Sequence, residues 1–185
     1  MIGLLKLKNN FPPLEGMRVR LQLFDESHIT DNYLAWLNDP VVVRYSRQRF
    51  IEHTHETSAK YLASFMGTEN LLLAIYLKET GHYVGTMSVY FSKVQQSADI
   101  GIMIGDPSCW GQGVGGDAWA TVIDWLLDVV MVAKVVGGTL RCNTSMVKIM
   151  FNSGMYLTSS WQEYELINGQ SVDVMYFEKV GTTGN

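Results

Sequence analysis

The chain has 185 residues, 47% of them hydrophobic and 17% charged, which is the composition of a folded globular protein able to bury a core in one domain. An intrinsically disordered chain is excluded by this composition. The formal net charge of −4, without a cluster of Lys or Arg, argues against nucleic acid as the main partner. Two cysteines, Cys109 and Cys142, are too few and too scattered for a disulfide framework.

The sequence carries no sign of a membrane segment. The longest apolar candidate, residues 122–132, is shorter than the ~20 residues of a spanning helix, and Asp124 and Asp128 interrupt it. The first residues lack the charged start and the apolar core of an export signal. We therefore expect a cytoplasmic protein without a membrane partner.

Hydrophobic periodicity and turn residues divide the chain into short elements, with no linker and no internal repeat. Strands are predicted at 14–23, 70–77, 82–91, 98–104, 134–142, 155–166 and 172–180. Helices are predicted from Asp25 or Ser27 to Leu37, from Thr54 or Thr57 to Phe65, around 118–127 and at 145–152. Asn168-Gly169 is a hairpin signal between the last two strands. We expect a loosely packed leader at 1–13, one mixed α/β domain at 14–180 and a flexible tail at 181–185.

The residues from Asp99 to Ala120 combine a strand, a glycine-rich bend and the start of a helix. Glycines allow several backbone N–H groups to point at one centre, and the first turn of a helix adds unpaired donors and the positive end of its dipole. This combination predicts a site for an anion, most simply a phosphate group.

Other interpretations of the bend are weaker. The spacing Gly111-x-Gly113-x-x-Gly116 matches the dinucleotide fingerprint, but the next strand ends in Arg-Cys-Asn without the acidic residue that the fingerprint requires. A nucleotide triphosphate loop is excluded because no Gly-Lys-Ser/Thr follows. A glycine turn without any ligand stays open as the simplest alternative.

Two segments together resemble the GNAT acetyltransferases. Trp110-Gly111-Gln112-Gly113-Val114-Gly115 is similar to the family's pyrophosphate loop. It is closest to the branch of the ribosomal-protein N-terminal acetyltransferases, where Trp commonly replaces the Gln or Arg that begins the loop. The segment from Asn143 to Gly154-Met155 resembles a second family stretch, which opens with Asn and closes with Gly-Phe. The resemblance implies a twisted, mostly antiparallel sheet of about seven strands with splayed fourth and fifth strands, and about four helices.

This resemblance implies acetyl-CoA as co-substrate, with its pantetheine arm between the two splayed strands and its diphosphate on the glycine loop. The cofactor-binding residues implied are Ile102, Met103, Ile104, Trp110, Gly111, Gln112, Gly113, Val114, Gly115, Gly116 and Asn143. Asn143 could equally be a turn-forming residue. We expect no metal, because His53 and His55 have no third ligand at a suitable spacing.

Acetyl transfer to an amine requires a base, a stabilised oxyanion and a leaving thiolate. Asp99 is the best candidate for the general base; the alternative is a structural Asp that pairs with a lysine or lies at the sheet edge. The backbone N–H of Met103 or Ile104 is the candidate oxyanion donor. Met150 stands where many family members carry a Tyr that acts as the general acid, and Met146 stands where some relatives carry a Ser for this role. Ser145, Cys142, Tyr156 and Tyr164 stay unranked as other proton donors for the thiolate.

Residues 41–55 are rich in Arg, Tyr and His, and in the family this segment borders the acceptor pocket. The candidate substrate-binding residues are Arg44, Tyr45, Arg47, His55 and Tyr164, and a solvated linker is the alternative. The function expected is acetyl-CoA-dependent N-acetylation of a primary amine, either a protein N-terminus or a small amine such as an amino sugar. The alternative is a catalytically silent acyl-CoA-binding module. The apolar C-terminal hairpin could support a homodimer.

Overall fold

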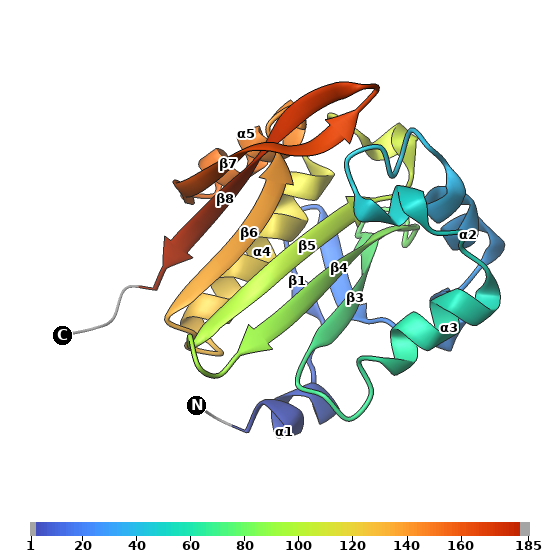
Figure 1. Ribbon diagram of the computed structural model, residues 1–185. Helices are drawn as coiled ribbons and strands as arrows, with labels where there is room; N and C mark the ends of the chain where they lie inside the picture. Colours follow the sequence, from blue (N-terminus) through green and yellow to red (C-terminus); the bar gives the residue numbers. More distant parts are fainter. Residues whose placement is uncertain (1–2, 182–185) are drawn as a thin grey trace.

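Residues 3–181, the part of the chain that the computed structural model describes, contain eight strands in one sheet of order β1-β2-β3-β4-β5-β6-β8-β7 (Figure 1). The strands are β1 (Leu14–Glu15), β2 (Val19–Leu23), β3 (Leu71–Leu77), β4 (Tyr83–Ser92), β5 (Ser97–Ile104), β6 (Lys134–Leu140), β7 (Tyr156–Ile167) and β8 (Gln170–Val180). Only β5 and β6 pair in parallel within this sheet. The predicted mixed α/β fold with mostly antiparallel strands is confirmed.

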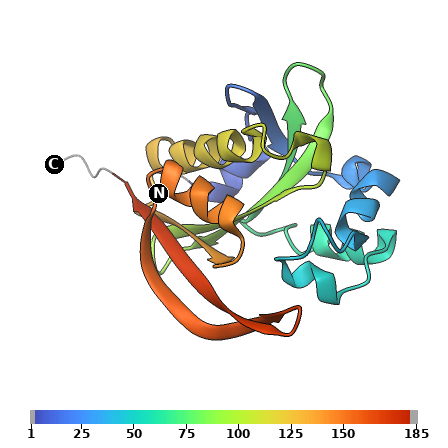
Figure 2. The same cartoon turned by 90° about the horizontal axis from the view of Figure 1, so that it is seen from above.

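Five α-helices occur in the described residues: α1 (Leu4–Asn9), α2 (Asp31–Asn38), α3 (His55–Ala63), α4 (Val114–Asp128) and α5 (Thr144–Asn152). Helices α4 and α5 lie on one face of the sheet, and α2 and α3 lie on the other (Figure 2). Short 3-10 turns lie at η1 (Glu26–His28), η2 (Arg47–Phe50) and η3 (Pro107–Cys109). No helix within residues 3–181 has both the length and the apolar character needed to cross a bilayer.

Alternate residues of β5 serve the two faces of the sheet. Ala98 and Ile100 are buried in the core beneath α4. Asp99, Gly101 and Met103 therefore share the opposite face, where Met103 packs with residues of α2. The register between β4 and β5 adds Tyr90, Ser88 and Thr86 of β4 to this second face. The same strand thus contributes to a hydrophobic core on one side of the sheet and to a more polar face on the other. We call this second face, which holds Asp99, Gly101 and Met103, the working face.

Asp117, in the first turn of α4, holds the chain where β1 turns into β2. Its carboxylate accepts hydrogen bonds from the backbone N–H groups of Met17, Arg18 and Val19 at 3.1, 2.7 and 3.0 Å. A Cβ at Gly16 would lie 2.6 Å from the same carboxylate, so this close approach requires glycine. The turn splits the single strand predicted at 14–23 into β1 and β2, and it brings both strands to the beginning of α4.

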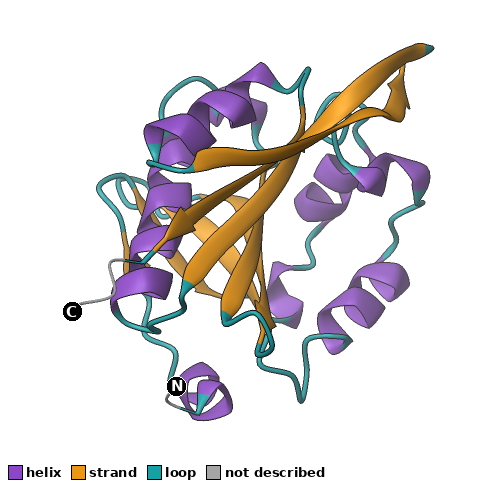
Figure 3. Cartoon of the chain, turned by 60° about the vertical axis from the view of Figure 1, so that its left-hand side comes forward, coloured by secondary structure: helices purple, strands orange, loops and turns teal. Residues whose placement is uncertain are grey.

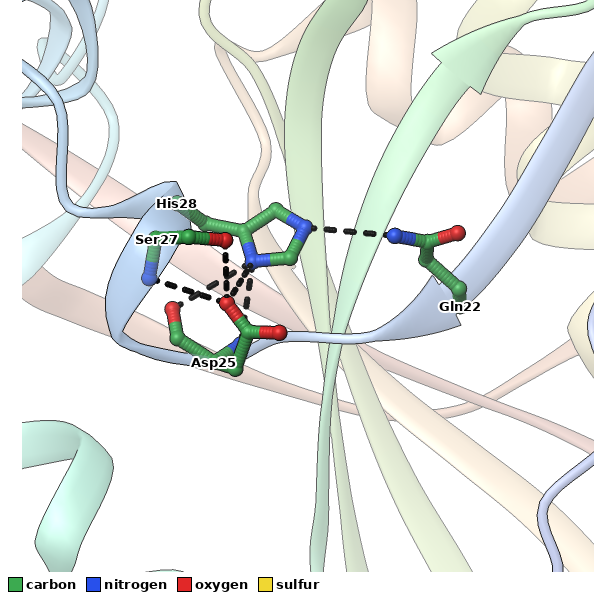
Figure 4. A network of polar contacts seen from close by, with 4 residues as sticks. All are labelled: Gln22, Asp25, Ser27 and His28. Carbon is green, nitrogen blue, oxygen red and sulfur yellow. Dashed lines mark hydrogen bonds and ion pairs between the residues drawn. The ribbon is translucent and has the colours of Figure 1, made fainter.

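The chain leaves β2 through a turn that a buried histidine organises (Figure 4). Asp25 caps η1: its carboxylate accepts the N–H of Ser27 at 2.9 Å and contacts Nδ1 of His28 at 2.8 Å. The other ring nitrogen of His28 lies 3.4 Å from the side-chain nitrogen of Gln22 on β2. The hydrogen bond with Ser27, followed by the contacts with His28, lowers the pKa of Asp25. This turn directs the chain toward α2, whose N-cap is Thr30 rather than the predicted Asp25 or Ser27.

The leader is better ordered than the sequence predicts. Residues 4–9 form α1, Leu4 is buried, and the ammonium group of Lys8 donates hydrogen bonds to the carbonyl oxygens of Phe65, Thr68 and Asn70. These contacts lie about sixty residues away in the chain, so a local pattern could not reveal them. The predicted tail beyond Gly181 lies outside the described residues.

Candidate active site

A glycine-rich loop joins β5 to α4. Gly111 and Gly113 have positive φ angles of 72° and 83°, a conformation in which other residues are strained. Gly113 is the N-cap of α4 and supplies no side-chain cap, so the first N–H groups of the helix have no such partner. Together with the positive end of the helix dipole, these donors form a cradle suited to an anion.

Trp110 anchors the start of this loop to the end of β5. Its indole Nε1 donates a hydrogen bond of 2.8 Å to the carbonyl oxygen of Ile104, the last residue of that strand. The face of the indole is turned to the guanidinium group of Arg44, 5.6 Å from the ring centroid. Trp110 therefore connects the loop both to the sheet and to the segment that follows α2.

The sheet opens between β5 and β6. The two strands pair at three positions, the last being Asp99 opposite Val136. Farther along, Gly101 and Gly138 leave this part of the working face without side chains of their own. The ring of Tyr176 covers Gly138, with its nearest atom 3.0 Å from where a Cβ would lie. This opening corresponds to the splay that the resemblance implies for the fourth and fifth strands.

The ladder between β4 and β5 decides which backbone groups face the opening. The N–H of Gly105 donates to the carbonyl oxygen of Val84 at 2.8 Å, and the register continues without a shift, so the odd-numbered residues of β5 bond to β4. The N–H of Met103 is therefore directed at β4, whereas those of Ile102 and Ile104 are directed at the opening. The register thus favours Ile104 over Met103 as a backbone donor to a bound thioester.

A cavity of about 850 Å³ follows the opening and draws its lining from both faces of the sheet. Ile102 and Trp119 come from the α4 side, and Thr86 and Ser88 come from the working face. Every cofactor-binding residue implied by the sequence lines this cavity except Gln112, whose amide donates to the carbonyl oxygen of Ser108. The cavity therefore connects the glycine loop with the opposite face of the sheet.

Asp99 lies on the working face, beside this cavity rather than in its lining. The carboxyl group is accessible to solvent, yet partial burial among the strands raises its pKa. Burial, the Tyr164 hydroxyl and the Asp99 carboxylate, in that order, raise the pKa of Tyr176, and Arg47 opposes them. One phenol, one carboxylate and one guanidinium group therefore influence the Tyr176 phenol.

The segment after α2 meets the C-terminal hairpin across the working face, where the hairpin curls away from α4 (Figure 2). The guanidinium group of Arg47 lies 5.9 Å from the ring centroid of Tyr164. Arg49 and Glu165 form an ion pair of 3.3 Å in which both side chains are largely buried. Arg44 and Tyr45 of the same segment line the cavity. Four of the five predicted acceptor residues thus lie where the segment after α2 meets the C-terminal hairpin. We call this part of the molecule the candidate acceptor region.

The structure does not bring His55 to this region. His55 is the first residue of α3, its side chain is 63% exposed, and its Nε2 lies 3.6 Å from the carboxylate of Asp31. The residue is absent from the lining of the cavity. The expectation that His55 binds the acceptor is therefore not supported, because α3 begins on the side facing the start of α2.

Asn143 is a helix cap that also borders the cavity. Its side-chain oxygen accepts the N–H of Met146 at 3.4 Å and caps α5, and the residue also lines the cavity. Among the unranked proton donors only Ser145 lines the cavity; Cys142 and Tyr164 do not. Tyr156 instead donates a hydrogen bond of 2.6 Å to Glu178 on the outer strands.

Several residues of this region escaped the sequence analysis. They are Thr86 and Ser88 of β4, Tyr61 of α3, Gly138 and Thr139 of β6, which line the cavity, and Tyr176 of β8 beside it. The alternation of β4 was the available signal for Thr86 and Ser88, since polar side chains recur at every second position there. The position of Tyr176 depends on strand order, which the sequence does not reveal.

Residues 18–156 match the profile of a protein family described as an acetyltransferase (GNAT) domain, which covers most of the chain. A comparison with curated protein sequences finds no match.

Solved structures of similar shape include several acetyltransferases. RimL, a ribosomal L7/L12 α-N-protein acetyltransferase in complex with coenzyme A, has a TM-score of 0.80 at 15% identity, covering 94% of this chain and 100% of that chain. Spermidine N-acetyltransferase from Vibrio cholerae with CoA and spermine has a TM-score of 0.78 at 14% identity, covering 89% and 96%. MccE, the microcin C7 self-immunity acetyltransferase with acetyl-CoA and AMP, has 0.75 at 18%, covering 89% and 93%. At these identities the likeness establishes the fold alone.

Proposed function

Because this chain belongs to the GNAT family of acetyltransferases, we propose that it moves the acetyl group of acetyl-CoA directly to a primary amine within a ternary complex. The observation that carries this proposal is the cavity that joins the glycine loop to the opposite face of the sheet. A donor bound at the loop and an acceptor bound on the working face would meet at the opening between β5 and β6, so no covalent enzyme intermediate is required.

The cofactor site would use main-chain groups. The diphosphate of acetyl-CoA would accept hydrogen bonds from the N–H groups between Gln112 and Gly116, at the positive end of α4. The pantetheine arm would lie in the opening as an added strand, bonded to the free backbone groups of Ile102, while the N–H of Ile104 would stay available for the thioester. Asn143 would contact the cofactor with whatever part of its amide the α5 cap leaves free.

The chemistry would begin when the amine nitrogen loses a proton to Asp99, directly or through water. The nitrogen then attacks the thioester carbon, and the developing oxyanion accepts a hydrogen bond from the backbone N–H of Ile104. The nitrogen gives up its second proton to solvent, the carbon–sulfur bond breaks as the tetrahedral intermediate collapses, and coenzyme A leaves as its thiolate. A raised pKa suits Asp99 to this step, because it makes the carboxylate a better proton acceptor than an ordinary Asp.

The leaving thiolate would be protonated without the family's Tyr or Ser. Met150 and Met146 line the cavity at those two positions and have no proton to give. Ser145 borders the same cavity and is the proposed donor among the four candidates. Amine acetylation tolerates a weak donor here, since a thiolate is an adequate leaving group near neutral pH.

The acceptor would bind between the segment after α2 and the C-terminal hairpin, with Tyr45, Arg47 and Tyr164 nearest to it. The names of the structural neighbours include acetyltransferases of a ribosomal protein and of spermidine. For this chain we propose a protein N-terminus or a small primary amine. The hairpin projects from the rest of the molecule (Figure 3) and exposes Leu157, Trp161 and Leu166, and we propose that a second copy of the chain packs against it.

Thiol release from acetyl-CoA with a panel of amines tests the proposal. The panel should hold alanyl, seryl and methionyl peptides, spermidine, glucosamine and amino-acid amides, and calorimetry with coenzyme A should accompany it. Amine-dependent thiol release is expected. The absence of coenzyme A binding would refute the proposal, whereas binding without release for any amine would support the alternative of a silent acyl-CoA-binding module. Light scattering gives the oligomeric state.

A further inference from the structure

The proposed cofactor-binding segment contains no positive side chain of its own. Between Val94 and Ala133 there is no Lys, Arg or His, although five Asp residues fall in that stretch. Coenzyme A carries a diphosphate and a 3′-phosphate, and hydrogen bonds from backbone N–H groups compensate only part of that charge. The remaining compensation must come from other parts of the chain or from solvent ions.

Arg44 reaches one end of the glycine loop. Its guanidinium group lies over the ring of Trp110 at 5.6 Å and over that of Tyr45 at 4.9 Å, and the residue lines the cavity. Stacking occupies the faces of a guanidinium group and leaves the N–H groups at its edge available for a phosphate. Within residues 3–181 no carboxylate lies at ion-pair distance from Arg44.

Trp110 occupies the position where the general GNAT loop begins with Gln or Arg, so a polar side chain is missing there. The hydrogen bond from its indole to Ile104 holds the ring in place. The ring therefore serves as a fixed platform for Arg44, which carries a positive charge to the loop from a segment more than sixty residues earlier in the chain.

Arg18 reaches the other end of the loop. Its backbone N–H donates to the carboxylate of Asp117 at 2.7 Å, which places residue 18 beside the first turn of α4. Its Nε lies 3.8 Å from the position that a Cβ of Gly113 would take. The side chain is exposed, and no ion pair with Arg18 occurs in the described part of the chain.

We propose that Arg44 and Arg18 supply the positive charge that the glycine loop lacks, Arg44 binding the diphosphate of coenzyme A from within the cavity and Arg18 binding the 3′-phosphate outside it. This inference rests on the proposed function. It assigns Arg44 to the cofactor, although its place after α2 had suggested the acceptor.

Calorimetric titration with coenzyme A and with 3′-dephospho-coenzyme A separates the two arginines. Arg44→Gln keeps a planar polar group without the charge, and it should weaken both ligands about tenfold, the value of one charge-assisted contact. Arg18→Ala should weaken coenzyme A by a similar factor and leave the dephospho ligand unchanged. Arg20→Ala is the matched control, because Arg20 is an exposed arginine of the adjoining strand β2 that is paired with Glu15. It should bind coenzyme A as the unaltered protein does.

The contrary outcomes are equally clear. A variant of Arg44 or Arg18 that binds coenzyme A within twofold of the unaltered protein would remove that arginine from the cofactor site. If Arg44→Gln raises the KM of the amine but not the Kd of coenzyme A, the residue binds the acceptor and the inference is wrong. An unaltered protein that does not bind coenzyme A at all would instead refute the proposed function. Thermal melting of each variant shows that it is folded.

Discussion

Arg49, in the turn after α2, lies 3.3 Å from Glu165 of the C-terminal hairpin, and neither group has more than a fifth of its side chain exposed. The contact is an ion pair without hydrogen-bond alignment, since Nη2 of Arg49 has no hydrogen-bond partner among the described residues. It joins two segments that are distant in the sequence and that together border the acceptor region. The ion pair therefore bridges the two segments that border the proposed acceptor region.

Breaking this pair should loosen the acceptor region and leave the cofactor region intact. Glu165→Gln and Arg49→Gln should each raise the KM of the amine, and a double-mutant cycle on kcat/KM should give a coupling energy of about 1 kcal/mol. The Kd of coenzyme A should not change in either variant. A coupling energy indistinguishable from zero would show that the two segments act independently.

Asp99→Asn should lower kcat by about 10²–10⁴-fold, the usual contribution of a general base. Burial raises the pKa of Asp99. The apparent pKa of the acidic limb of the kcat/KM profile should therefore lie above that of an ordinary Asp carboxyl group, and activity should rise with pH as Asp99 ionises. Asp128→Asn, an exposed change at the end of α4, is the control. A variant Asp99→Asn that retains full activity would exclude Asp99 as the base.

The same substitution should stabilise the folded protein at neutral pH. A raised pKa means that the native state holds the proton of Asp99 more tightly than the unfolded chain does, so stability falls as pH rises through the two pKa values. Asn carries no such penalty. In urea unfolding, the free energy of unfolding of Asp99→Asn should therefore exceed that of the unaltered protein at a pH above both pKa values. This difference in free energy should disappear in acid. An equal difference at both pH values would point to packing instead.

Gly113→Ala should reduce both stability and affinity for coenzyme A, because Ala in the left-handed region costs about 1–2 kcal/mol and the strained loop would move. Gly81→Ala provides a matched control: its φ is +67°, and no atom lies within 4 Å of the added Cβ. Thermal melting should show a similar decrease in melting temperature for both variants. Calorimetry should show weaker coenzyme A binding only for Gly113→Ala. Equal binding by the two variants would argue against the loop as the diphosphate site.

Asp117→Ala should destabilise the protein by about 2–3 kcal/mol, since three backbone N–H groups lose a charged acceptor. Asp124, on the same helix, forms only an exposed ion pair of 3.4 Å with Lys179. Its replacement by Ala should cost at most about 1 kcal/mol. Denaturant unfolding of both variants measures the contrast, and similar losses would mean that the turn at Gly16 does not depend on Asp117.

Local signals in the sequence predicted most elements. Thr54 caps α3 in a capping box, and Asn168 and Gly169 adopt the positive φ angles of a hairpin turn. The six-residue helix α1 escaped prediction because it lacks a side-chain cap at its N-terminus and is held by the distant contacts of Lys8. Seven predicted strands became eight because Asp117, one hundred residues away, bends the first strand at Gly16.

The candidate site was predicted as far as it is continuous in sequence. The glycine loop and the strand before it line the cavity as expected. Tyr176 could not be assigned to the site, because its place over Gly138 depends on the order of β6 and β8. The preference for Ile104 over Met103 likewise depends on hydrogen-bond parity between strands. The structure places His55 away from the cavity, because residues 41–55 do not form one surface: α3 begins within them.

The cavity that crosses the sheet has a consequence for inhibition. Its lining comes from both faces of the sheet, so we expect the cofactor and the acceptor to enter from different sides. Coenzyme A could depart while the acetylated product is still held, and neither ligand would need to wait for the other's exit. A compound that joins the sulfur of coenzyme A covalently to an amine mimic would occupy the cofactor and acceptor sites at once. Because it would pass between β5 and β6, it should dissociate slowly.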